Sequence, residues 1–159
     1  MARMDKSQGG LIIVMSVLLA MVLMLIPLPE GLRFYRPEWV LLTLMYWAMA
    51  LPQRVGVGYA WVVGLFMDVL LGGSLGILAF AYALVIYLIL NSHLQLRQFP
   101  LWQQALSLMS LILLVHVVTV VMTTRMTGWH AWLPAIVSTV LWPVIYIFLR
   151  GVRRTFHVR

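Results

Sequence analysis

The carboxylate of Asp68 stands inside an otherwise apolar stretch of the chain, GLFMDVLLGGSLG at residues 64–76. An aspartate placed within a membrane costs about 2.5–3.5 kcal/mol, so it needs a hydrogen-bond donor or water beside it. Paired with a second ionisable group, this carboxylate could relay protons or hold an ion. Bonded to backbone amides instead, it would tie one helix to a neighbouring turn.

Two kinds of partner are open to Asp68. His116 has a similar predicted depth, since it lies roughly 23 Å along a helix from Leu101 and Asp68 lies roughly 20 Å along a helix from Val55. The sequence therefore predicts an Asp68–His116 contact. Three arginines near the same predicted end are alternatives: Arg33, Arg36 and Arg125. The other kind of partner is the set of backbone amides in the GGS turn at 72–74, which gives a purely structural role.

Small residues recur every fourth position around Asp68. The series is Gly56, Ala60, Gly64, Asp68, Gly72 and Gly76. Small residues at this spacing let the backbone of a neighbouring membrane helix approach closely. We expect Gly64 to lie on such a packing face, and Gly72 and Gly76 to lie beyond the end of the helix.

The segment RFYRPEW at 33–39 has the features of an anchored helix start. Arg36 and Glu38 flank Pro37. Proline suits the first turn of a helix because its missing N–H costs nothing there, and an acidic side chain is favoured near a helix N-terminus. Arg54 ends the turn PQR at 52–54 and is predicted to be a topology anchor on the inner side.

The remaining polar residues form no recognisable catalytic or metal-binding motif. We find no zinc-protease, hydrolase or phosphate-loop pattern and no pair of intramembrane aspartates. The chain has no cysteine, which excludes disulfides, thiolate metal sites and a cysteine nucleophile. His93, His130 and His157 are dispersed without metal-ligand spacing. The sequence therefore predicts no enzyme, no catalytic residue, no cofactor and no metal.

The composition places these residues in a membrane protein. The chain is 64% hydrophobic and only 9% charged, whereas soluble domains are about 45–50% apolar and about 25% charged. The apolar runs are continuous rather than alternating, which favours helices over a barrel. Although the net charge is +7, the basic residues flank the apolar runs, so they indicate orientation rather than binding to nucleic acid.

Six apolar segments predict an all-α integral membrane protein, a compact bundle of six transmembrane helices in one domain over residues 1–159. The predicted spans are 11–28, 38–51, 55–71, 75–90, 101–124 and 132–149. The first is interpreted as a retained span and not as a signal peptide. With the N-terminus inside, the inner loops and ends carry more basic residues than the outer loops, as the positive-inside rule requires. Both termini are therefore predicted to be cytoplasmic.

A longer stretch, RPEWVLLTLMYWAMALPQRVGVGYAWVVGLFMDVLLGGSLG at 36–76, resembles the rod shape-determining MreD family in its proteobacterial form. LWQQAL at 101–106 and LWPVIYIFLRGVRRTF at 141–156 resemble it as well. The positions that match recurring family residues are Arg36, Pro37, Arg54, Gly64, Asp68, Gly72 and Gly76. His116 is a candidate from its predicted depth alone. No catalytic residue is implied.

The resemblance implies a fold similar to the substrate-binding membrane component of energy-coupling factor transporters. It also implies a non-catalytic role in the bacterial inner membrane, in lateral wall elongation. The implied partners are MreC, RodA, a penicillin-binding transpeptidase and the actin-like MreB, in addition to the lipid bilayer. The alternative from the residues themselves is a small-solute-binding or transport subunit, in which short helices and a buried acid line a pocket.

Overall fold

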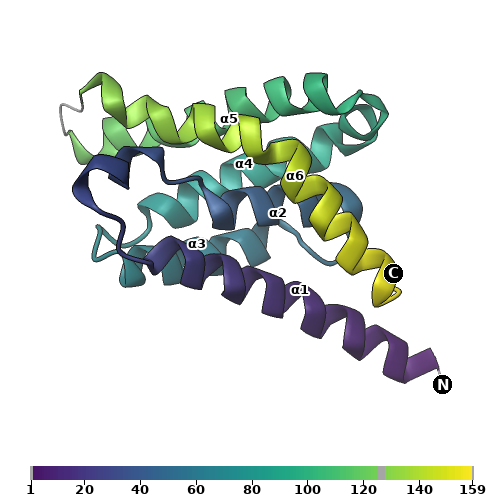
Figure 1. The fold of residues 1–159 in the computed structure, drawn as a ribbon. Coiled ribbons are helices and arrows are strands. Elements are labelled where there is room, and N and C mark those ends of the chain that lie inside the picture. The colour runs from purple at the N-terminus through teal and green to yellow at the C-terminus, as the bar shows by residue number, and fades with distance from the viewer. Residues whose placement is uncertain (1, 125–127, 159) are drawn as a thin grey trace.

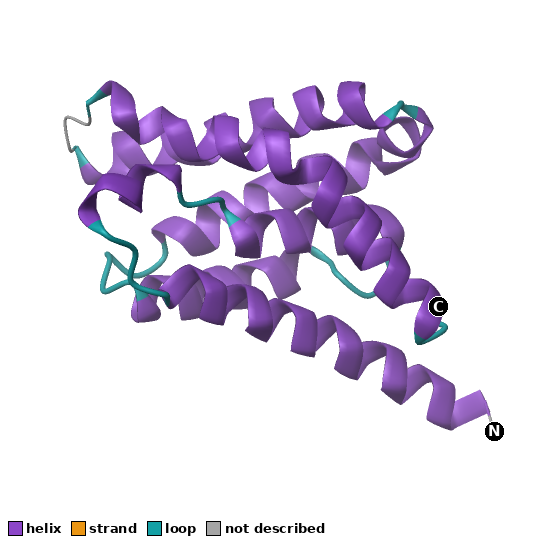
Figure 2. Ribbon diagram, viewed as in Figure 1, coloured by secondary structure: helices purple, strands orange, loops and turns teal. Residues whose placement is uncertain are grey.

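The structure is a computed structural model that describes residues 2–124 and 128–158, with side chains described from residue 9 onward. Its described residues form helices and connecting loops, as the sequence predicts (Figure 2). The α-helices are α1 (Ala2–Leu25), α2 (Trp39–Ala50), α3 (Val57–Leu70), α4 (Ile77–Gln98), α5 (Leu101–Thr123) and α6 (Leu133–Thr155). Two short 3₁₀ helices are η1 (Glu30–Tyr35) and η2 (Trp129–Trp132).

The short helix α2 lies at the centre of the bundle and contacts α1, α4 and α6 (Figure 1). Every residue from Val40 to Met49 is buried. A helix that is hydrophobic on all sides is expected in such an interior position. With 12 residues, α2 is only about 18 Å long, well below a ~30 Å hydrocarbon core. Its neighbours shield it, so its short length leaves no unprotected backbone in lipid.

The outer surface of the bundle is apolar. Along α1, for example, Leu11, Met15, Leu19 and Val22 are all exposed. Three helical segments are long and apolar enough to cross a membrane by length and composition: Ile77–Gln98, Leu101–Thr123 and Trp129–Thr155. Val57–Leu70 is a shorter apolar helix, and Gly9–Leu25 is the apolar part of α1 whose side chains are described. These features fit a protein that lies within a lipid bilayer.

The helix that contains the predicted span 75–90 continues beyond that span. The polar stretch NSHLQLRQFP at 91–100 continues α4 as far as Gln98. It contains no glycine, and its proline comes only at position 100, so nothing in it breaks a helix before that point. The polarity of this stretch therefore indicates where α4 leaves the apolar region, and not where the helix ends.

The two chain termini lie at the same end of the bundle (Figure 1). We call this the terminal end; it also holds the turns at 51–56 and 99–100. The opposite end, here the distal end, holds the connections at 26–38, 71–76 and 128–132 (Figure 1). The residues that the sequence singled out divide between these two ends.

Candidate functional site

Asp68 lies at the distal end and binds the start of the next helix, α4. Its Oδ2 accepts hydrogen bonds from the backbone N–H groups of Gly76 at 2.9 Å and Ala79 at 3.3 Å, and its Oδ1 accepts one from Leu78 at 3.1 Å. The side chain is only 2% exposed. The first amides of a helix have no partner within the helix and carry partial positive charge. These amides therefore stabilise the buried carboxylate of Asp68, both through hydrogen bonds and through their partial positive charge.

The predicted Asp68–His116 contact is wrong. The Nε2 atom of His116 lies 3.8 Å from Oε1 of Glu38, which is an ion-pair distance when the imidazole is protonated. The Nδ1 atom lies 2.9 Å from the carbonyl oxygen of Ile112 in the preceding turn. Similar depth along two helices does not bring two side chains together unless the helices also turn the same faces toward each other. The purely structural alternative, bonding to nearby amides, is the arrangement found.

Gly64 allows α3 and α4 to approach closely one turn before Asp68. A Cβ atom at this position would lie 2.5 Å from the Cα of Ala79 and 2.7 Å from the carbonyl oxygen of Leu78. Gly72 and Gly76 lie beyond the end of α3, as the spacing predicts, and have φ angles of 65° and 97°. Glycine adopts such positive φ angles without steric cost. Together these glycines bring the first turn of α4 within reach of the carboxylate.

Arg36 donates hydrogen bonds to backbone carbonyl groups at the end of α1, whereas Asp68 accepts them from backbone amides at the start of α4. Its Nη1 donates to the carbonyl oxygen of Met24 at 2.7 Å, and its Nη2 donates to that of Ile26 at 2.5 Å. The last carbonyls of a helix lack partners within the helix and carry partial negative charge, so a cation stabilises them. The alternative pairing of Arg36 with Asp68 is therefore also wrong.

Replacing Arg36 with alanine should lower the stability of the folded chain by about 2 kcal/mol, because two carbonyls lose a charged donor. Lysine should recover part of this loss, because an ammonium group lacks the fork that reaches two acceptors at once. Thermal unfolding in mild detergent, followed by tryptophan fluorescence, measures the effect. Arg33→Ala is the matched control, since Arg33 is exposed in the same connection. Equal losses in the two alanine variants would contradict the role assigned to Arg36.

Glu38 makes polar contacts with two other helices that were not predicted from the sequence. It is the N-cap residue of α2, after the buried Pro37, but its side chain makes no capping hydrogen bond. The carboxylate lies instead near His116 of α5, and its backbone N–H donates to Oγ of Ser138 in α6 at 2.9 Å. The start of the central helix is thus held to α5 and α6. Glu38 could have been singled out from the sequence because it is one of only four acidic residues and stands directly beside an apolar segment.

Gln104 of α5 links this helix to α4 and α6, closer to the terminal end. Its Nε2 donates to the carbonyl oxygen of Leu96 in the last turn of α4 at 3.0 Å, and its Oε1 accepts from Nε1 of Trp142 in α6 at 3.0 Å. The side chain is buried. Gln104 shares a face of α5 with the buried Leu108 and Ile112. A glutamine on a buried apolar face was the signal that could have identified it.

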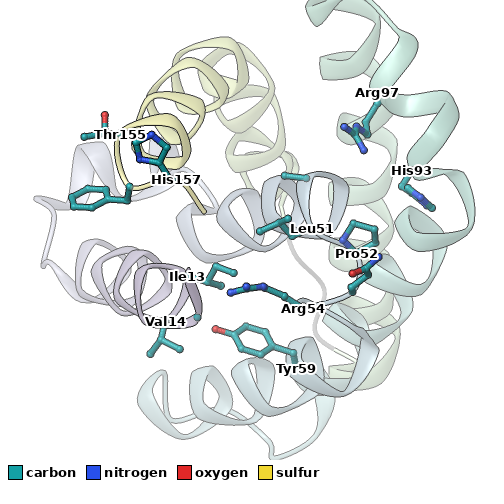
Figure 3. A pocket seen from close by; sticks show the side chains of 14 residues that line it. Ile13, Val14, Leu51, Pro52, Arg54, Tyr59, His93, Arg97, Thr155 and His157 are labelled. Atoms are coloured by element: carbon teal, nitrogen blue, oxygen red, sulfur yellow. The ribbon is translucent and has the colours of Figure 1, made fainter. Parts of the chain in front are cut away.

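A large cleft opens at the terminal end, with a volume of about 1460 Å³. The turn that follows α2 forms its floor, and α1, α3, α4 and the end of α6 form its walls (Figure 3). Arg54, Arg97, His93 and His157 are among its lining residues. Arg54 packs toward α1, since a Cβ atom at Gly9 would lie 2.5 Å from its Nη1 atom. Asp68 does not line this cleft.

The chemistry open to these groups is limited. Among the side chains described, those of residues 9–124 and 128–158, no group of three or more histidine, cysteine or acidic residues could hold a metal ion. Asp68, Arg36 and Gln104 are each engaged by backbone groups of the same chain. Their arrangement is suited to fixing helix ends relative to one another.

Comparison of the sequence with known proteins identifies the family. The family model described as rod shape-determining protein MreD matches residues 5–152. The chain is 35% identical over 140 residues to the rod shape-determining protein MreD of Haemophilus influenzae, and the match covers 86% of each chain. No solved structure matches the chain. With nearly its whole length matched by the family model, this chain belongs to the MreD family of rod shape-determining proteins.

Proposed function

We propose that this chain is a non-catalytic component of the bacterial inner membrane that maintains rod shape by binding MreC. RodA, a penicillin-binding transpeptidase and MreB are the further proposed members of the same complex. Family membership supports the role in rod shape. The single observation that supports a binding role is that the buried polar groups bond to the chain's own backbone. Asp68, Arg36 and Gln104 bond within the bundle, which leaves the outer surface to meet partners.

We further propose six membrane crossings with both termini in the cytoplasm. The excess of arginine and lysine near the terminal end supports this orientation. The location of both termini at one end of the bundle fits an even number of crossings (Figure 1). In this arrangement α2 and α3 cross as short helices shielded by their neighbours. The implied likeness to the membrane component of energy-coupling factor transporters stays a prediction.

The glycines, Pro37, Arg36, Arg54 and Asp68 are proposed to act through the fold and not through chemistry on a substrate. The solute-binding alternative required polar side chains gathered around Asp68 in a closed pocket. The large cleft lies at the other end of the bundle, and both oxygens of Asp68 accept backbone hydrogen bonds. No observation therefore favours that alternative.

Depletion of the protein in a rod-shaped bacterium should cause rounding, and expression of the wild-type chain should restore rods. The restored cells also allow a pull-down after mild detergent extraction, in which MreC should be recovered with the chain. An unrelated membrane protein of similar size and the same tag is the control for nonspecific recovery. Cells that stay rod-shaped on depletion would contradict the role in shape. Rounding without recovery of MreC would contradict the proposed binding.

A further inference from the structure

Two ionisable side chains, Glu38 and His116, meet inside the bundle near its distal end. Glu38 directly precedes α2, and His116 lies in the second half of α5. The Oε1 atom of Glu38 lies 3.8 Å from the Nε2 atom of His116, and each side chain is only 16% exposed. Because both groups are largely removed from water, a charge on either one needs compensation nearby. The protonation states of the two groups are therefore linked.

The contact of the other ring nitrogen identifies the tautomer of His116. Its Nδ1 atom lies 2.9 Å from the carbonyl oxygen of Ile112. A carbonyl oxygen only accepts hydrogen bonds, so Nδ1 carries a hydrogen and donates it. If the ring were neutral, Nε2 would present a lone pair to the carboxylate of Glu38. A second proton, on Nε2, replaces this repulsion with the attraction between opposite charges.

The groups around Glu38 favour its anionic form, which leaves the proton on His116. Glu38 is the N-cap residue of α2, and the partial positive charge of a helix N-terminus favours an anion. Arg36 lies within electrostatic range of Glu38 and acts in the same direction. The phenol of Tyr82 in α4 is also within range, but a phenol is uncharged near neutral pH.

The neighbours that α6 and η2 contribute do not titrate. The backbone N–H of Glu38 donates to Oγ of Ser138 in α6 at 2.9 Å. The ring of Trp132 in η2 lies 6.2 Å from the ring of His116, measured between centroids. Loss of the proton would therefore weaken the contact between α5 and the start of α2, while the hydrogen bond to α6 would remain.

We propose that His116 and Glu38 form a proton-binding site, in which a proton on Nε2 joins α5 to the start of the central helix α2. Histidine is the side chain whose charge ordinarily changes between about pH 5 and 8, so this contact can respond to the pH at the distal end. A folded chain that holds a proton more tightly than the unfolded chain loses stability as the pH rises. The inference depends neither on the role in cell shape nor on the orientation in the membrane.

Nitrogen NMR of the full chain in lipid nanodiscs, with labelled histidine, observes the proton directly. At about pH 7, Nε2 of His116 should be protonated in most wild-type molecules, and Glu38→Gln should lower this fraction at least about threefold. The signal that disappears in His116→Gln identifies the residue. A largely unprotonated Nε2 in the wild type would overturn the proposal, and this outcome needs no variant to fold. Equal protonated fractions in the wild type and Glu38→Gln would overturn it as well.

Thermal unfolding in mild detergent tests the consequence for the fold. Between about pH 6 and about pH 9, the unfolding temperature of the wild type should fall by about 3 °C more than that of His116→Gln. The reason is that only the wild type has an ion pair to lose. His130→Gln is the matched control, since His130 is exposed at the same end, and it should keep the wild-type pH dependence. The same pH dependence in the wild type and His116→Gln would overturn the proposal.

Discussion

Replacing Asp68 with alanine is expected to destabilise the folded bundle by about 3 kcal/mol. The change removes one carboxylate that accepts three backbone hydrogen bonds, from Gly76, Leu78 and Ala79. These amides lie in partly or fully buried surroundings, so water does not readily replace the lost acceptor. Thermal unfolding in mild detergent measures the loss, and the amount of protein in the membrane should fall with it.

Two variants show whether the loss comes from these hydrogen bonds. Asp68→Asn keeps one acceptor oxygen in place, so it should lose less than Asp68→Ala does. Glu30→Gln removes a carboxylate that is exposed at the same end of the bundle, and it should change stability by less than about 0.5 kcal/mol. An Asp68→Ala protein as stable as the wild type would show that the amides of α4 do not depend on this side chain.

Replacing Gly64 with leucine is expected to separate α3 from α4 and to prevent normal accumulation of the protein. Even a Cβ atom at this position would lie 2.5 Å from the Cα and 2.7 Å from the backbone nitrogen of Ala79. Backbone atoms cannot rotate away, so the helices must shift. Overpacking of this kind costs about 1–3 kcal/mol or more, and the shift also moves the amides that Asp68 binds. Membrane abundance and unfolding temperature are the measurements.

Gly58 offers a control within the same helix. A Cβ atom there meets no atom within 4 Å, so Gly58→Ala should be neutral or should stabilise the helix by up to about 1 kcal/mol. Gly64→Ala should be destabilising, although less so than leucine. If Gly58→Ala and Gly64→Ala behave alike, the close approach of α3 and α4 does not limit stability. Non-additive losses in a Gly64→Ala, Asp68→Ala double variant would show that the two residues act on the same contact.

The elements could be predicted from the sequence because their signals are local. Continuous apolar runs, prolines and glycines define the helices, and the spacing of Gly64, Gly72 and Gly76 correctly separates a packing position from two turn positions. The extension of α4 to Gln98 lies beyond the predicted apolar span 75–90, because a polar stretch without helix-breaking residues continues a helix past its apolar part.

The pairing of the polar groups could not be predicted in the same way. Asp68 and His116 have similar predicted depth, but depth along a helix does not fix which neighbour a side chain faces. Glu38, which is the actual neighbour of His116, lies at the start of the central helix and was interpreted as a local helix-start residue. Gln104 reaches both α4 and α6. Such contacts depend on the arrangement of several helices, which no local pattern contains.

Hydrogen exchange of individual backbone amides, measured by NMR on the full chain in lipid nanodiscs, tests the central claim most directly. The claim is that Asp68 holds the first turn of α4. In the wild type, the amides of Leu78 and Ala79 should exchange slowly, although the first turn of a helix ordinarily exchanges fast. In Asp68→Ala their exchange should accelerate by about 100-fold, equivalent to about 3 kcal/mol, while amides in the middle of α5 change far less. Fast exchange of Leu78 and Ala79 in the wild type, or unchanged exchange in the variant, would contradict the account.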